Sequence, residues 1–242
     1  VLNSLYVMRP PLQFNTGKRF TYCNTNYALL ALVIESVTGM PYKTYLEDTF
    51  FKPLQMTDTY VFTQEDQARS IPSFEWNNRK YDFEYLDAVY GDKNIYSTVQ
   101  DLLKWDQALY PGRLFSQKTL DSAFAPYSFE RPGVRNYGLG WRMTFEENGK
   151  KILYHNGWWH GNRTAFYRLI DEDVTIIALC NNDAKKVYSV KEMADIFGDY
   201  MQKRDHDDDD EVAKTRPARS RNTGTAYLKK KKSIGTSLTA KK

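Results

Sequence analysis

Cysteine and histidine are scarce in this sequence, which has two cysteines and three histidines among its 242 residues. Neither Cys23 nor Cys180 lies in a Cys-x-x-Cys pair, so the sequence predicts no structural metal site. The two cysteines are too far apart in the sequence to decide the redox compartment. We expect both to be buried thiols that pack as small apolar groups.

Long apolar runs are also absent. The longest covers residues 27–34 and is far shorter than the roughly 20 residues that a membrane-spanning helix needs. We therefore predict no membrane span. No signal peptide is visible, but the chain begins with Val1 rather than methionine, so this absence carries little information.

Most of the chain lacks an excess of either charge, although the net charge is +4. Residues 1–204 hold 24 basic and 24 acidic side chains, whereas residues 205–242 hold 10 basic and 6 acidic ones. A balanced body gives no reason to expect a nucleic-acid-binding face. The tail cannot bury enough apolar surface to offset its ordering entropy. We predict one globular domain at residues 1–204 and a disordered charged tail at 205–242.

The first half of the chain has helical patterns. Residues 27–37 are apolar nearly all round, which predicts a buried helix after Asn24. Gly39 suits the end of that helix, and Pro41 suits the first position of a second helix at residues 42–50.

Residues 60–96 follow with no firm period and predict loops with short elements. Ser97 to Gln100 matches a capping box for a helix that ends near residue 109. Ser116 can cap a short helix that ends near residue 124.

The second half has the pattern of strands joined by short polar links, which predicts an antiparallel sheet. Ser189 to Glu192 matches another capping box, and apolar residues at helical spacing predict a helix from there to about residue 203 that packs on the sheet. The predicted strands cover residues 137–144, 151–155, 164–170 and 174–180.

Five segments in a fixed order carry the chemistry that the sequence suggests. Each of them is weak alone, but together they resemble the serine β-lactamase-like family over about residues 10–200. That family includes class C β-lactamases, D-alanyl-D-alanine carboxypeptidases and related esterases. The segments are Tyr22-Cys23-Asn24, Pro53 to Thr59, Gly91 to Leu102, Tyr137-Gly138-Leu139-Gly140-Trp141 and His155-Asn156-Gly157.

The resemblance implies a mixed α+β fold in which helices flank an antiparallel sheet beside a helical lobe. It also implies hydrolysis of amides or esters through a serine acyl-enzyme, without a metal or cofactor. D-alanyl peptides, β-lactams and small esters are the candidate substrates. The family further suggests a location in the cell envelope, the periplasm or outside the cell.

The same resemblance assigns roles to individual residues. Tyr22 would shuttle a proton, which requires a nearby positive charge because a phenol ordinarily has a pKa of about 10. Asn24 would orient the lysine of the first motif and the substrate amide. His155 would donate a hydrogen bond to Tyr22 or to a substrate carboxylate, and we expect its charge to vary around neutral pH.

The substrate-binding residues implied by the resemblance follow His155 directly. Asn156 and Gly157 complete the third motif, and Gly157 would let a substrate lie against the strand edge. The backbone N–H of Trp158 would form half of an oxyanion hole. The pair Trp158-Trp159 and His160 would line the mouth of the site, although packing is the simpler interpretation of both tryptophans.

The family's first motif, Ser-x-x-Lys, is absent from residues 1–242. In the family it precedes Tyr-x-Asn, and Tyr22 lies close to the start of this sequence. We therefore expect the motif and the first strands of the sheet to lie outside the printed residues, and the chain alone to be inactive. A catalytically dead binding module of the same fold is the alternative. Cys23 is a poor substitute nucleophile, because side chains of adjacent residues point apart.

Overall fold

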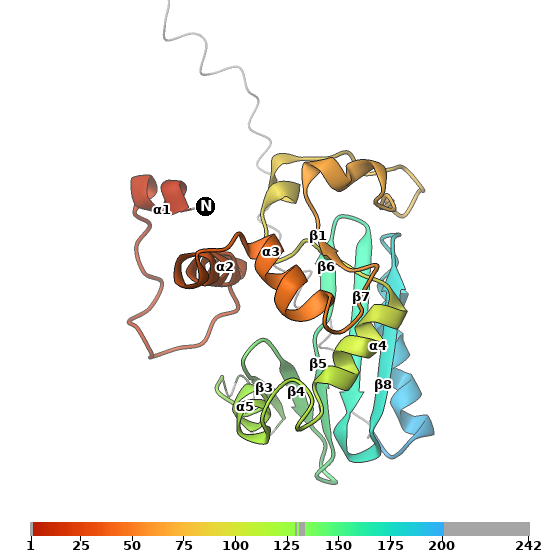
Figure 1. Cartoon of the computed structure of the whole chain (residues 1–242). Helices are drawn as coiled ribbons and strands as arrows, with labels where there is room; N and C mark the ends of the chain where they lie inside the picture. The colour runs from red at the N-terminus through yellow and green to blue at the C-terminus, as the bar shows by residue number, and fades with distance from the viewer. Residues whose placement is uncertain (1, 129, 131–133, 201–242) are drawn as a thin grey trace, which may run out of the picture. The chain divides into compact units, whose positions relative to one another are not determined.

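The computed structural model describes residues 2–128, 130 and 134–200 of the chain. These residues belong to one compact unit, in which helices come first and an antiparallel sheet follows (Figure 1). The α+β class expected from the sequence is confirmed. The predicted tail at residues 205–242 lies outside the described residues. Among the described helices, none has the length and apolar character that a membrane crossing requires.

The helical part contains five α-helices and one small two-stranded sheet among the described residues, with short 3₁₀ turns between them. Helix α3 continues directly into a single π-helical segment at Glu47–Phe51. The elements are α1 (Leu2–Met8), α2 (Asn24–Thr38), α3 (Tyr42–Leu46), β1 (Tyr60–Val61), β2 (Ile95–Tyr96), α4 (Val99–Ala108) and α5 (Gln117–Ala123), with 3₁₀ turns at Gln64–Ala68 and Tyr85–Ala88.

The larger sheet is antiparallel throughout the described residues. A 3₁₀ turn at Ile170–Glu172 joins its last two strands, and a longer 3₁₀ segment, η5 (Lys185–Ile196), follows them. The strands are β3 (Arg135–Tyr137), β4 (Arg142–Phe145), β5 (Lys151–Tyr154), β6 (Gly157–Trp159), β7 (Asn162–Leu169) and β8 (Val174–Cys180).

Strands β5 and β6 behave as one interrupted strand. Both pair with β7, β5 along its second half and β6 along its first half, and the break falls at His155 and Asn156. On this side, strand β4 pairs with β5 but does not reach β6. The pairing of β4 with β5 ends where Arg142 lies opposite Tyr154. Within the part of the chain that the structure describes, β6 therefore has no strand partner on its outer edge.

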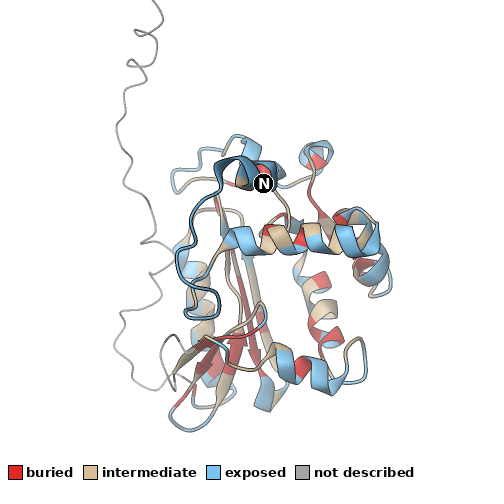
Figure 2. Ribbon diagram, turned by 90° about the vertical axis from the view of Figure 1, so that its left-hand side faces the viewer, coloured by how far each residue is buried: buried red, intermediate tan, exposed pale blue. Residues whose placement is uncertain are grey.

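Both faces of β7 are covered. Tyr167 and Leu169 lie in a buried core with Ala194 of η5. Arg168 points to the opposite face because side chains alternate along a strand, and its Nε donates a hydrogen bond of 2.5 Å to Asp106 of α4. The central strands accordingly show as largely buried in Figure 2.

A second core holds the helical part together. It lies between α2, α3 and β1, and residues of α4 such as Trp105 pack around it. Its buried members are Ala31, Tyr42, Leu46, Phe51, Met56 and Val61.

The prediction of a buried helix at residues 27–37 is wrong. Only Ala28 and Ala31 of α2 are buried, whereas Val37 is 79% exposed. The apolar pattern all round the helix suggested contacts on every side, but α2 packs with one side on α3 and leaves much of its length exposed in the described part of the chain (Figure 2).

The cap at Gly39 is confirmed, because its φ is 69° and its N–H donates to the carbonyl of Glu35. Pro41 caps α3 instead of opening it. The capping box at Ser97 is wrong by one residue. The hydroxyl of Thr98 accepts from the N–H of Asp101, since the hydroxyl of Ser97 is hydrogen-bonded elsewhere. Ser116 caps α5 as predicted.

Two further expectations are corrected. Residues 137–144 do not form one strand, because β3 ends at Tyr137 and the chain bends at Leu139 and Gly140, whose φ is 81°, before β4 begins at Arg142. The helix predicted from Ser189 is instead part of the longer 3₁₀ segment, and the Ser189 hydroxyl donates to a carbonyl within it. Cys23 and Cys180 are free and only partly buried, so the expectation of buried thiols is wrong.

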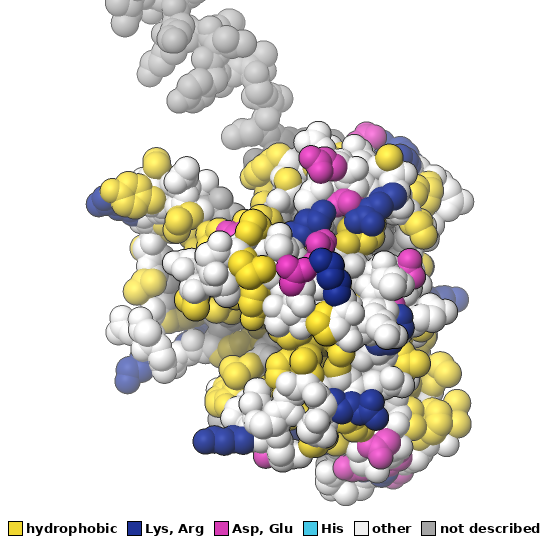
Figure 3. All heavy atoms as spheres, in the orientation of Figure 1, with side chains coloured by type: hydrophobic (Ala, Val, Ile, Leu, Met, Phe, Trp, Pro, Cys, Tyr) yellow, Lys and Arg dark blue, Asp and Glu magenta, His cyan; other side chains and the backbone are white. Residues whose placement is uncertain are grey.

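Charged side chains of both signs are interspersed on the face drawn in Figure 3. Local ion pairs among the described residues include Lys52 with Asp48 and Lys104 with Asp101. That face therefore carries no single-sign patch of the kind that binds nucleic acid.

Candidate active site

The free edge of β6 exposes backbone groups. The N–H of His155 donates to the carbonyl of Phe166 at 3.1 Å, and Gly157 lies opposite Thr164 in the same register. Hydrogen bonds to one neighbour alternate along an antiparallel strand. Trp158 directly follows Gly157, so its backbone N–H is directed away from β7 and toward the free edge.

Three tyrosines surround His155 beside this edge. The rings of Tyr22 and His155 lie 6.1 Å apart, and those of Tyr22 and Tyr137 lie 5.8 Å apart. The hydroxyl of Tyr137 lies 3.1 Å from Nε2 of His155 and 2.8 Å from the hydroxyl of Tyr27. The segment before α2, the start of α2 and the sheet thus meet at one cluster.

His155 is uncharged at neutral pH. Burial and the positive charge of Arg142 lower its pKa to about 4. Its Nδ1 lies 2.9 Å from the carbonyl of Asn156, so Nδ1–H donates there and Nε2 accepts from the Tyr137 hydroxyl. The expected titration near neutral pH is therefore wrong, and the imidazole does not donate to Tyr22 because both of its nitrogens are engaged elsewhere.

Tyr22 lies between opposing charges. The residue is 39% exposed, yet desolvation by partial burial is the largest cause of the raised pKa of its phenol. The guanidinium of Arg142 lies over the ring, 5.2 Å from its centroid, and opposes that rise. Asp92 adds to the rise. The phenol is thus protonated at neutral pH, with one cation close to it.

Asn24 lies at the start of α2, two residues after Tyr22, and is exposed. Among the described residues it makes no hydrogen bond to Tyr22 or His155. Cys23 between them takes the N-cap position in an extended conformation, and its side chain forms no cap hydrogen bond. The structure therefore brings Tyr22 to His155 and leaves Asn24 beside them.

Asn156 is anchored within the sheet. Its amide nitrogen donates to the Tyr167 hydroxyl at 2.9 Å, while its amide oxygen is buried without a partner among the described residues. At Gly157, a β-carbon would lie 2.3 Å from the Thr164 hydroxyl oxygen. A larger residue here would therefore force the Thr164 side chain to move, whether or not a substrate approaches the free edge.

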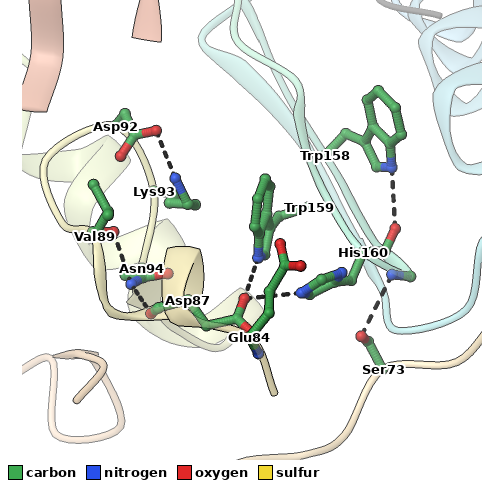
Figure 4. Close-up of polar contacts among 11 residues, drawn as sticks. Ser73, Glu84, Asp87, Val89, Asp92, Lys93, Asn94, Trp158, Trp159 and His160 are labelled. Carbon is green, nitrogen blue, oxygen red and sulfur yellow. Dashed lines mark hydrogen bonds and ion pairs between the residues drawn. The ribbon is translucent and has the colours of Figure 1, made fainter. Parts of the chain in front are cut away.

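The two tryptophans of β6 point in different directions (Figure 4). The Trp158 indole donates to the carbonyl of His160 at 3.0 Å, and the guanidinium of Arg163 stacks 4.4 Å from its ring centroid. The Trp159 indole instead donates to the carboxylate of Asp87, with the ammonium of Lys93 4.5 Å from its ring.

Asp87 joins the helical part to the sheet. One carboxylate oxygen accepts from the Trp159 indole and lies 2.9 Å from Nε2 of His160, as Figure 4 shows. The other accepts from the backbone N–H of Glu84 at 2.7 Å. The side chain of Asp87 is only 10% exposed. This single carboxylate therefore fixes the end of β6 against the loop that precedes β2.

Four residues of this site were not predicted from the sequence, namely Tyr27, Asp87, Tyr137 and Arg142. Tyr137 is the first residue of the motif segment that ends at Trp141, and Arg142 is the residue after that segment. The sequence therefore drew attention to this region but not to these two side chains. No sequence pattern marks Asp87. In the described part of the chain, no group of histidine, cysteine and acidic residues is arranged to hold a metal ion.

The fold and this cluster define a class of protein: an α+β domain in which a tyrosine ahead of a helix faces a histidine at the free edge of an antiparallel sheet. The sequence profile of the Beta-lactamase family matches residues 5–196. The chain belongs to the Beta-lactamase family.

Individual relatives agree with this assignment. Penicillin-binding protein 4* of Bacillus subtilis is 30% identical over 72% of this chain and 42% of that protein. A D-aminopeptidase of Brucella canis is 25% identical over 69% of this chain and 33% of that protein. The crystal structure of a penicillin-binding protein from Bacillus halodurans superposes with a TM-score of 0.70 at 22% identity, over 81% of this chain and 62% of that chain. This chain thus spans less than half the length of these two curated relatives.

Proposed function

We propose that this chain is part of a serine hydrolase that cleaves amide or peptide bonds through an acyl-enzyme. The observation that carries the proposal is the position of Tyr22 against His155, where β6 presents a free edge. Family membership supports the reaction class, and the relatives include a penicillin-binding protein and a D-aminopeptidase. Relatives of the first kind also support a location at the cell envelope.

The proposed roles follow from the chemistry of each group. The Tyr22 phenol would pass a proton between a serine nucleophile and the leaving group, and a serine supplied by Ser-x-x-Lys would form the ester. Asn24 would orient the substrate amide, for which its exposed side chain is free to turn. The N–H of Trp158 would donate to the oxyanion, an interaction whose loss typically costs about 10²–10³ in rate.

We do not assign His155 the role of a charged hydrogen-bond donor, because its imidazole is neutral. Neutral and hydrogen-bonded to Tyr137, it would hold the wall of tyrosines in place while Asn156 and Gly157 set the course of the strand. A small-molecule or peptide substrate would then lie along the free edge of β6.

Covalent labelling tests the proposal. A fluorescent penicillin and a fluorophosphonate would be applied to the printed chain and to the natural protein that contains it. We expect labelling of the natural protein on a serine of a Ser-x-x-Lys segment, and none of the printed chain, which has no such segment. Tyr22→Phe should slow labelling of the natural protein by about 10²-fold, whereas Tyr85→Phe, at a residue 79% exposed, should not.

Failure of both probes on the natural protein would overturn the proposal. Saturable stabilisation by ligands without any turnover would then favour a binding module of the same fold.

A further inference from the structure

The sheet holds strand β6 on one side only. The strand pairs with β7 from Gly157 to Trp159, and the N–H of Trp158 on its outer edge is the donor that we propose for the oxyanion. The direction of this N–H is set by the backbone of the strand and of the turn that follows it. Whatever fixes the end of β6 therefore also fixes the proposed donor.

The turn after β6 begins with a residue in an unfavourable conformation. His160 has a φ of +50°, a region that residues other than glycine adopt only at a cost. Its carbonyl accepts from the Trp158 indole at 3.0 Å, and its ring stacks on that of Tyr81 with the centroids 4.9 Å apart. Contacts from outside the sheet thus hold the backbone just after the proposed donor.

The segment at residues 73–87 lies directly on this turn. The N–H of Gly161 donates to the Ser73 hydroxyl at 3.4 Å, and a β-carbon at Gly161 would collide with the backbone of Phe74. Phe74 is tied to the end of β8, because its N–H donates to the carbonyl of Asn181 at 2.8 Å. The segment therefore has a fixed position against β6.

Asp87 connects this segment to β6 through a single carboxylate (Figure 4). One oxygen accepts from the Trp159 indole and lies 2.9 Å from Nε2 of His160, while the other accepts from the N–H of Glu84. The backbone of Asp87 is fixed as well, because the side-chain amide of Asn94 donates to its carbonyl. Both residues that follow the proposed donor thus depend on one anchored carboxylate.

We propose that Asp87 is a positioning residue that aims the N–H of Trp158 at the developing oxyanion. It acts through Trp159 and His160, and touches no reacting atom itself. This role rests on the proposed function, which supplies the reaction that the N–H serves. An oxyanion donor is effective only when it is directed at the place where charge develops, so a small displacement of the strand end lowers the rate.

Asp87→Asn tests positioning with little change in the size of the side chain. The amide oxygen can accept from Trp159 and His160, or from the N–H of Glu84. It cannot serve both sides, because the amide nitrogen only donates. The variant therefore weakens the link between the segment and β6 without leaving a cavity.

Acylation of the natural protein that contains this chain measures the effect. A fluorophosphonate would be used at a series of concentrations, and rates would be expressed per site that reacts. We expect Asp87→Asn to lower the rate constant at saturation at least about tenfold, because the oxyanion donor acts in the transition state. The half-saturating concentration should change less than about twofold, since binding of the probe does not depend on that donor.

Two further variants complete the design. Asp82→Asn is the matched control, because Asp82 is an exposed carboxylate of the same segment, and it should leave both kinetic values unchanged. Trp159→Phe removes the indole donor but keeps an aromatic ring, and should slow acylation as Asp87→Asn does. If Asp87→Asn and Trp159→Phe only reduce the fraction of reactive sites, with the rate constant unchanged, Asp87 has a structural role alone and the proposal is overturned.

An NMR measurement on the printed chain separates this inference from the proposed function. Asp87→Asn should shift the backbone amide signal of Trp158, and Asp82→Asn should not. If the natural protein resists both probes, the proposed function fails, and an unshifted Trp158 amide would then refute the hold of Asp87 on that N–H. If the natural protein and its Asp87→Asn variant are labelled equally fast, only the positioning role fails.

Discussion

At the scale of single residues, the site depends on side chains that have more than one partner. Tyr137 shares its hydroxyl between Tyr27 and His155, and Asp87 shares one carboxylate oxygen between Trp159 and His160. Removing such a residue leaves several polar groups without partners at once, which costs more than the loss of one hydrogen bond.

We predict that Asp87→Ala lowers the free energy of unfolding by about 2–4 kcal/mol, because the indole N–H of Trp159 and the ring of His160 lose their acceptor. Asp87→Asn should cost less than half as much, since its amide oxygen can still accept. Urea unfolding followed by tryptophan fluorescence measures the change, and the indole N–H signal of Trp159 should shift in both variants. Asp82→Ala, exposed in the same loop, should change stability by less than about 0.5 kcal/mol. Equal effects at both positions would contradict the prediction.

At the scale of elements, the close approach of α2 to the loop before β2 explains why residue 91 is glycine. Gly91 has a φ of +96°, and a β-carbon there would lie 2.7 Å from the carbonyl oxygen of Tyr27 and 2.8 Å from the β-carbon of Ala31. The loop before β2 therefore packs directly on α2, behind the ring of Tyr27 that reaches the site.

Gly91→Ala should destabilise the protein by about 2–4 kcal/mol, since strain at positive φ and overpacking against α2 add together. Gly112 is the matched control, because its φ is +77° but nothing lies within 4 Å of a β-carbon built there. Gly112→Ala should therefore cost only about 1 kcal/mol. Urea unfolding of both variants makes the comparison, and equal costs would show that packing against α2 contributes nothing.

Much of the arrangement of elements could be predicted from the sequence, because strands and caps leave local signals. The strands at residues 151–155 and 174–180 and the caps at Gly39 and Ser116 are examples. The exposure of α2 could not be predicted, since an apolar pattern shows which faces of a helix can pack but not what surrounds them. The same limit applies to the site. Motif order marked Tyr22 and His155, but only the tertiary fold brings Arg142 over Tyr22 and Asp87 to Trp159 and His160.

At the scale of the whole molecule, acid should unfold this protein through protonation of both His155 and several carboxylates. Burial raises the pKa of Asp101, but hydrogen bonds from Lys104 and Thr59 outweigh it and hold that pKa below its usual range. Asp66 behaves in the same way. Carboxyl groups with lowered pKa values stabilise the fold above the pKa of the unfolded chain, and this contribution is lost as the pH falls.

His155 adds a loss that begins at higher pH. Its pKa is about 4 in the folded protein, against about 6.5 in an unfolded chain, so the unfolded state alone binds the proton between these values. The free energy of unfolding should therefore decrease as the pH falls from about 6.5 to 4, by at most about 3 kcal/mol from this residue. His155→Gln keeps a side chain that can hydrogen-bond but does not titrate, so its stability should change less over that interval. Urea unfolding at half-unit pH steps compares the two proteins. Parallel curves would mean that folding does not shift the pKa of His155, and the lowered value would have to be abandoned.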